Sequence, residues 1–298
     1  MEGIAVNEDF AGQVAVVTGA GRGLGRAYAL WLAKAGVKVV VNNRARAGRT
    51  SVAEAVAREI RDGGGIAIAN EDRIEDPAGA ARLVAAALGA FDRLDILVCN
   101  AGITTFMLLD EMSAEDFQQI MSVNFYGSLY PIQAALKPMY AAGYGRIVAT
   151  ASTAAWYPIP GVSAYAASKS ALIGLVRTLG TEAGDRNVRI NLIAPMAYTP
   201  MSYGHMDENL ADLFSTDHIA PVVGWLSAPS CDRSGGILTI GGGEVRRVGI
   251  VEGPGQRIEP DMADFWARLE SLEGGKERAT GMETADSLIA AFRVSQRG

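Results

Sequence analysis

Three residues with acid–base and hydrogen-bonding side chains lie between positions 152 and 169. Tyr165 and Lys169 are four residues apart, so they share one face if this segment is helical. A tyrosine phenol has an ordinary pKa of about 10, too high for ready proton exchange at neutral pH, and a nearby ammonium group would lower that pKa. Ser152 could donate a hydrogen bond to a substrate oxygen on which charge develops. The three residues predict proton exchange at an alcohol or carbonyl oxygen.

A glycine-rich turn supplies a second candidate site. Residues 18–27 read TGAGRGLGRA, with glycines at 19, 23 and 25. The turn lies between an expected strand at 14–18 and an expected helix at 25–36, the context in which glycines let the backbone approach a pyrophosphate. The sequence lacks the Gly-Lys-Ser/Thr of a nucleoside triphosphate loop. It therefore predicts a dinucleotide site.

The end of the second expected strand bears on which dinucleotide binds. An NAD site usually places an acid about 20 residues past the glycines, where it accepts a hydrogen bond from the ribose. Here that position is Asn43, followed by Arg44 and Arg46, and Arg22 lies inside the glycine turn. Guanidinium groups pair well with phosphate, so we favour NADP(H). The alternative is that the arginines are solvated and that NAD(H) binds through Asn43.

Short apolar runs alternate with Ala/Leu-rich segments along the chain. This pattern predicts an α/β fold, a single doubly wound parallel-sheet Rossmann domain with helices on both faces and ligands at the carboxyl ends of the strands. About seven strands are expected, at 14–18, 37–41, 66–70, 94–102, 146–152, 188–195 and 237–243. Helices are expected at 25–36, 51–65, 77–91, 113–143 (one or two, with Ser113 as the first cap) and 165–184. We expect one domain over 1–298, with residues 244–298 as an extension packed on it that includes a helix at 261–272.

The composition excludes several classes of protein. The 298 residues are 49% hydrophobic, with a net charge of −6 and no basic stripe, so nucleic acid is not an expected partner. Two cysteines make no disulfide framework, and His205 and His218 are too few for a predicted metal site. No apolar run reaches the roughly 18 residues of a membrane span or forms a signal peptide. We expect a soluble, cytoplasmic protein.

Together these motifs resemble the short-chain dehydrogenase/reductase family. The resemblance rests on TGAGRGLG, on CNAG at 99–102, on Asn124 in SVNFYGS, on Ser152 and on YAASK. It implies that Tyr165 is the general acid/base, that Lys169 binds the nicotinamide ribose, that Ser152 polarises the substrate oxygen and that Asn124 holds a relay water. It also implies a cofactor site made by Thr18, Gly19, Arg22, Gly23, Leu24, Gly25, Asn43, Arg44, Asp72 (at the adenine), Asn100, Ala101, Gly102, Tyr165, Lys169, Pro195 and Thr199. Cys99 stands where the family more often has asparagine, and we interpret it as a small buried residue.

The C-terminal third has a narrower resemblance. The stretches HIAPVVGWLSAPSCDRSGGILTIGGGEV and EPDMADFWARLESLEG resemble the (3R)-hydroxyacyl-CoA dehydrogenase units of type 2 peroxisomal multifunctional enzymes. These units usually take NAD and carry aspartate at the position of Asn43. The resemblance implies a 3-hydroxyacyl/3-oxoacyl thioester as substrate and assembly as a homodimer or homotetramer. A hydroxysteroid or another bulky ketone is the alternative substrate, and a dinucleotide-sensing scaffold without turnover is the non-enzymatic alternative.

The remaining candidates lie where a substrate would enter. Four side chains between 196 and 206 are soft or aromatic, which suits an acyl or sterol surface as well as simple loop packing. They are Met196, Met201, Tyr203 and Met206. Trp156 and Tyr157 could form the opposite wall or belong to the core.

Overall fold

The computed structural model describes residues 10–45, 48, 50–204, 206–255, 274–277, 283–284 and 286–288. The chain divides into two compact units, Met1–Arg247 and Val248–Gly298. The helix expected at 261–272 lies outside the described residues, and the packing of the C-terminal extension on the same domain stays a prediction. Within the described part of the chain, no helix is long and apolar enough to cross a membrane.

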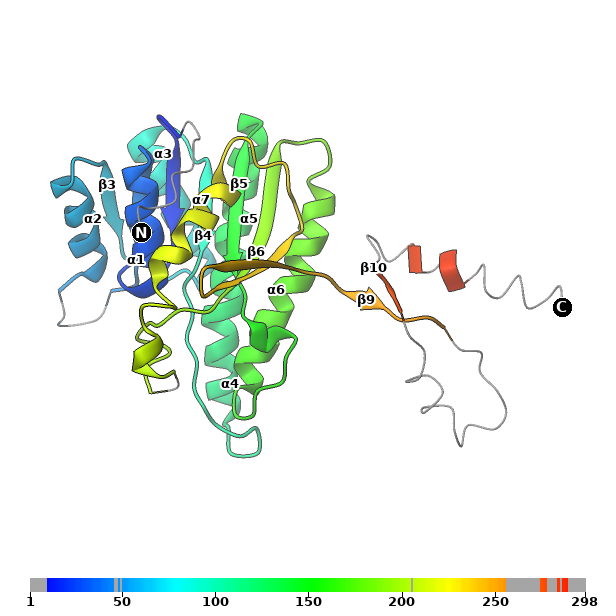
Figure 1. The fold of residues 1–298 in the computed structure, drawn as a ribbon. Coiled ribbons are helices and arrows are strands. Elements are labelled where there is room, and N and C mark those ends of the chain that lie inside the picture. The colour runs from blue at the N-terminus through cyan, green and yellow to red at the C-terminus, as the bar shows by residue number, and fades with distance from the viewer. Residues whose placement is uncertain are drawn as a thin grey trace, which may run out of the picture. The chain divides into compact units, whose positions relative to one another are not determined.

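An eight-stranded sheet forms the centre of the first unit (Figure 1), in the order β3-β2-β1-β4-β5-β6-β7-β8. The six pairings between neighbouring strands from β3 to β7 are all parallel. Every residue of β1, β4 and β5 is buried, as expected of strands covered on both faces. The bounds are β1 Val14–Val17, β2 Lys38–Asn42, β3 Ala67–Asn70, β4 Ile96–Cys99, β5 Gly145–Thr150, β6 Val188–Pro195 and β7 Ile237–Gly241.

The eighth strand, β8 at Glu244–Val248, corrects the expectation of seven. The strand expected to reach residue 243 ends at Gly241 instead. Gly242 and Gly243 then have φ values of 59° and 78°. Positive φ at two successive residues is what a two-residue hairpin turn requires. A two-residue turn joins antiparallel strands, so β8 runs against β7.

Helices cover both faces of this sheet. Helix α1 packs against α2 and α7, whereas α3 packs against α5, and α4 against α6. The bounds are α1 Gly23–Lys34, α2 Val52–Asp62, α3 Pro77–Phe91, α4 Ala114–Met121, α5 Gly127–Ala142, α6 Ser163–Glu182 and α7 Ala220–Ser227. Short 3-10 turns occur at η2 Thr153–Ala155, η3 Glu208–Leu210 and η4 Thr216–His218. In the second unit, β9 Val251–Glu252 pairs antiparallel with β10 Lys276–Glu277.

The long helical segment expected at 113–143 is two helices joined by a π-helical turn. The turn, η1 at Ser122–Tyr126, lies between α4 and α5. Ser113 caps α4 as predicted, since its Oγ accepts from the backbone N–H of Asp116 at 3.0 Å. The π-helical turn places Asn124 in the buried interior, beneath the carboxyl edge of the sheet.

Candidate active site

A large cavity of about 900 Å³ lies at the carboxyl ends of the parallel strands. In doubly wound sheets this edge is where ligands bind. The cavity brings together most of the predicted site residues, namely Gly19, Arg22, Gly23, Leu24, Asn43, Arg44, Asp72, Asn100, Ala101, Gly102, Ser152, Tyr165, Lys169, Pro195 and Thr199. Three predicted residues do not line it. Thr18, Gly25 and Asn124 lie behind its wall, and we describe what each contacts below.

Three of the four predicted catalytic residues, Ser152, Tyr165 and Lys169, line this cavity. Ser152 follows β5, and its Oγ accepts from the N–H of Ala154 at 3.2 Å. Tyr165, in the first turn of α6, shares a side-chain hydrogen bond with Ser152. Lys169 lies one helical turn later, with its Nζ 5.7 Å from the centroid of the Tyr165 ring. The serine and tyrosine hydroxyls can therefore contact the same substrate oxygen.

The electrostatics differ from the expectation that Lys169 lowers the pKa of Tyr165. Burial raises the pKa of Tyr165 above its ordinary value, and the opposing influence is the hydrogen bond with Ser152. Burial also lowers the pKa of Lys169 to about 8. Its Nζ donates to the carbonyl oxygen of Thr150 at 2.7 Å. The tyrosine is thus a firmly protonated acid in this structure, because desolvation outweighs its polar neighbours.

Asn124 holds the loop that follows β4. Its Oδ1 accepts from the N–H of Ile103 at 2.8 Å, and its Nδ2 donates to the carbonyl of Ile103 and to Ser168 Oγ, both at 3.0 Å. The side-chain amide is therefore committed to protein groups. A part for Asn124 in a proton relay stays a prediction, and it would have to use the main-chain carbonyl.

The glycine turn fits a pyrophosphate. A Cβ on Gly25 would lie 2.4 Å from the carbonyl oxygen of Gly19, so this glycine is required for the close packing of helix on strand. Gly23 has a φ of 54° and opens onto the cavity, where a Cβ would meet nothing closer than Thr199 at 3.6 Å. Helix α1 begins there without a side-chain cap and without an acid in its first turn. Its first N–H groups and positive dipole end can thus bind an anion.

Thr18 ties the first strand to the fourth. Its Oγ1 accepts from the N–H groups of Asn100 at 3.0 Å and Ala101 at 3.2 Å. The threonine is fully buried, so it shapes the cofactor wall and does not form its surface.

The residue that follows β2, at position 43, is an asparagine and not an acid. Asn43 lines the cavity, and its Nδ2 donates to the carbonyl of Arg44 at 3.3 Å. Arg44 Nη1 lies 4.0 Å from Glu75 Oε1, whereas Arg22 is exposed and forms no ion pair within the described part of the chain. Arg46 lies outside the described residues. Two arginines are therefore placed where a 2′-phosphate could be bound.

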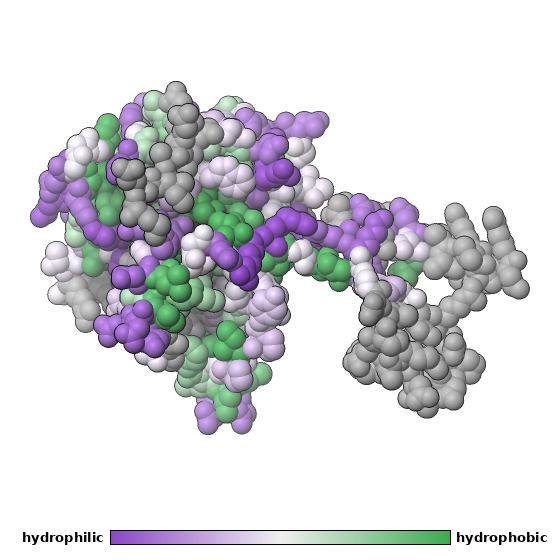
Figure 2. Space-filling model, in the orientation of Figure 1, coloured by the Kyte–Doolittle hydropathy of each residue, from purple (hydrophilic) through white to green (hydrophobic). Residues whose placement is uncertain are grey.

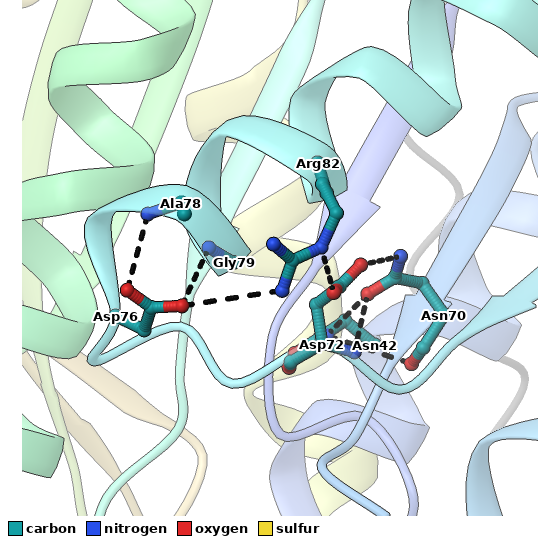
Figure 3. A network of polar contacts seen from close by, with 7 residues as sticks. All are labelled: Asn42, Asn70, Asp72, Asp76, Ala78, Gly79 and Arg82. Carbon is teal, nitrogen blue, oxygen red and sulfur yellow. Dashed lines mark hydrogen bonds and ion pairs between the residues drawn. The ribbon is translucent and has the colours of Figure 1, made fainter.

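Asp72 belongs to a polar network that sequence reasoning did not find (Figure 3). Its two carboxylate oxygens accept from Asn70 Nδ2 at 2.8 Å and from Arg82 Nε at 2.6 Å. Asn42 Nδ2 donates to Asn70 Oδ1 at 2.8 Å, which links the ends of β2 and β3. Asp76 caps α3 next to this network through the N–H groups of Ala78 and Gly79. Ten residues separate Asp72 from Arg82, so no local spacing signals the contact.

The substrate end is apolar, partly as predicted. Met196, Met201, Tyr203 and Met206 all line the cavity. The aromatic pair expected to form another wall, Trp156 and Tyr157, is not part of the lining. Ile159, Phe106 and Val162 line the cavity, whereas Trp156 and Tyr157 contact one another edge to face outside it.

The family profile described as short chain dehydrogenase matches residues 13–209. The chain belongs to the short-chain dehydrogenase family. It is therefore an oxidoreductase of a family that binds NAD(P)(H).

Several relatives of this short-chain dehydrogenase span most of its length. A short-chain type dehydrogenase/reductase of Mycobacterium tuberculosis is 36% identical, and the match covers 89% of this chain and 96% of that one. The structure of full-length peroxisomal multifunctional enzyme type 2 from Drosophila melanogaster is 32% identical with a TM-score of 0.82, and the match covers 95% of this chain and 50% of that one. A 3-oxoacyl-[acyl-carrier-protein] reductase of Synechocystis is 40% identical over 61% of this chain and 73% of the reductase. The chain thus spans about half the length of the Drosophila enzyme.

Proposed function

We propose that this short-chain dehydrogenase interconverts a secondary alcohol and a ketone by hydride transfer, with Tyr165 as the general acid/base. One observation carries the proposal. Ser152 and Tyr165 share a hydrogen bond on the wall of the cavity, so both hydroxyls can hold one substrate oxygen. The bound nucleotide supplies or accepts the hydride, and the protein supplies the proton and the orientation.

The proton would move between the substrate oxygen and the Tyr165 phenol. Because burial keeps the pKa of Tyr165 high, the phenol carries its proton at neutral pH and can donate it to the oxygen during ketone reduction. Ser152 stabilises the charge on that oxygen. Lys169, held by the Thr150 carbonyl, provides a cation within reach that can favour the phenolate in the opposite direction.

We propose NADP(H) as the preferred cofactor. The absence of an acid at Asn43 removes the repulsion that a 2′-phosphate would meet there, and Arg22 and Arg44 lie on the same cavity wall. Arginine suits this task because its planar guanidinium forms paired hydrogen bonds to phosphate. Arg44 Nη1 lies 4.0 Å from Glu75 Oε1. The side chain of Arg44 would therefore have to turn from Glu75 toward the 2′-phosphate when NADP(H) binds.

The proposed substrate is a 3-hydroxyacyl/3-oxoacyl thioester. The support is the likeness to a reductase named for 3-oxoacyl groups. A hydroxysteroid or another bulky ketone is a second candidate, favoured by the apolar lining at residues 196–206. Assembly as a homodimer or homotetramer and a cytoplasmic location remain predictions, and the relatives include peroxisomal enzymes.

Turnover of acetoacetyl-CoA with NADPH and with NADH, side by side, tests the proposal. We expect reduction with NADPH preferred and a loss of at least about 100-fold in kcat for Tyr165→Phe, as for removal of a general acid. Faster turnover with NADH would overturn the cofactor assignment alone. Full activity of Tyr165→Phe would overturn the mechanism, and turnover of any carbonyl compound would exclude the sensing scaffold.

A further inference from the structure

We infer that this enzyme recognises its substrate through a bulky apolar group and leaves the phosphates of a coenzyme A-type head group unbound. The inference rests on the proposed function and narrows its substrate class. The carrier of the thioester would then contribute little to recognition.

Three segments, residues 103–112, 152–163 and 196–215, frame the substrate end of the cavity, and the side chains that they contribute to its lining are apolar or carry uncharged hydroxyl groups. Phe106, Ile159 and Met201 line the cavity and are 49%, 45% and 44% exposed. A main-chain hydrogen bond from Met107 N–H to the carbonyl of Gly161, at 2.8 Å, joins the first two segments. Figure 2 shows apolar surface in the lower half of the view, with hydrophilic groups at its margins. Exposed apolar surface at a cavity mouth indicates a ligand-binding region.

The charges in these segments have one sign. Residues 103–112, 152–163 and 196–215 contain no lysine or arginine. Their charged residues, apart from His205, are acids, namely Asp110, Glu111, Asp207, Glu208 and Asp212. A coenzyme A head group carries phosphates at both the pyrophosphate and the ribose, and proteins usually bind such groups with arginine, lysine or helix amino ends. These segments would repel that head group weakly and offer it no cation.

The cations that line the cavity are committed elsewhere. Arg22 and Arg44 lie at the glycine turn and at the end of β2, where the nucleotide is proposed to bind. Lys169 is buried and bonded to Thr150. Within the described lining, therefore, no cation is left for the head group, and beyond the hydrogen bonds of Ser152 and Tyr165 to the substrate oxygen the main source of binding energy is burial of apolar surface. The chemical class that fits is a long or polycyclic acyl group on any thioester carrier.

Four thioesters test this inference. We would measure kcat/KM with saturating NADPH for acetoacetyl and 3-oxododecanoyl groups, each on coenzyme A and on N-acetylcysteamine. We expect the long chain to be preferred by more than about tenfold on both carriers, which corresponds to about 1.4 kcal/mol. We expect the two carriers to differ by less than about threefold, with little change from low salt to about 0.2 M salt. A preference for coenzyme A above about tenfold, lost at high salt, would overturn the inference.

A charge reversal provides an independent check. Glu208→Lys places a cation at the start of η3, two residues after the cavity-lining Met206, and should raise the coenzyme A to N-acetylcysteamine ratio several-fold at low salt. Asp62→Lys makes the same charge change at the far end of α2, before β3 begins, and should leave the ratio unchanged. An equal rise in both variants would attribute the effect to net charge and overturn the local argument.

An uncharged 17-ketosteroid, assayed beside the four thioesters, separates the inference from the proposed function. Reduction of an uncharged 17-ketosteroid but of none of the four thioesters would overturn the thioester assignment and support apolar recognition. Turnover of acetoacetyl-CoA alone would support the thioester assignment and overturn the inference.

Discussion

The Asp72 network makes a quantitative prediction for Arg82→Gln. Arg82 Nε donates to Asp72 Oδ1 at 2.6 Å, and the two side chains are 60% and 20% exposed. A hydrogen bond to a charged group is worth about 1.5–3 kcal/mol when protected, whereas exposed ion pairs give about 0.2–1 kcal/mol. The exposure of Arg82 places this contact near 1 kcal/mol. If Asp72 contacts the adenine, its loss of orientation should weaken NADPH binding by about fivefold.

Two ligands and one control variant isolate this effect. The dissociation constant of NADPH, measured by its fluorescence in the cavity, should rise about fivefold in Arg82→Gln. Reduced nicotinamide mononucleotide lacks the adenosine, so its kcat/KM should not change. Arg246→Gln removes an exposed arginine that pairs with Glu244 on β8, at the opposite edge of the sheet from β3, and should affect neither ligand. Equal weakening of both ligands in Arg82→Gln, or no weakening of NADPH, would refute the role given to the network.

Three further substitutions have expected outcomes. Lys169→Met should abolish turnover yet stabilise the protein at pH 7 by about 3 kcal/mol, because burial lowers the pKa of Lys169 from 10.5 to about 8 and the charged lysine therefore costs stability wherever it stays protonated in the folded protein. Between pH 8 and 10.5 the folded lysine loses its proton while the unfolded lysine keeps it, so this cost disappears. Wild-type stability in urea should therefore rise from pH 8 toward 10.5, and that slope should vanish in the variant. Gly25→Ala should cost about 1–3 kcal/mol by thermal unfolding, since its Cβ would meet the Gly19 carbonyl oxygen at 2.4 Å. Asn124→Ala, which removes three hydrogen bonds, should cost about 2 kcal/mol, whereas unchanged stability would mean that the Ile103 loop is held by other contacts.

The parallel core of the fold was predictable because its signals are local. The strand at Val188–Pro195 and the helix at Pro77–Phe91 were predicted at their observed bounds. Apolar runs mark buried parallel strands, and Pro77 after the cap Asp76 marks the helix start. The eighth strand was missed because Glu244–Val248 is polar and mostly exposed. Its one signal was the Gly242–Gly243 pair, which is typical of a hairpin turn.

Most of the predicted site residues line one cavity, whereas their electrostatics differ from the prediction. Family resemblance placed Tyr165 and Lys169 together, and the structure lines one cavity with both. Sequence spacing gives no measure of desolvation, so the raised pKa of Tyr165 and the bond from Lys169 to Thr150 were not foreseen. The contact between Asp72 and Arg82 joins a loop to a helix face, and such tertiary pairs leave no periodic trace in a single sequence.

The hairpin at the end of the sheet has a consequence for behaviour at high concentration. A parallel sheet that ended at β7 would present a strand with unpaired backbone groups to other molecules, which is a template for aggregation. β8 covers that strand and carries Glu244, Arg246 and Arg247. Charged side chains on a short terminal strand discourage a further strand from adding. The turn at Gly242–Gly243 thus protects the protein against edge-to-edge polymerisation, a solubility function separate from catalysis.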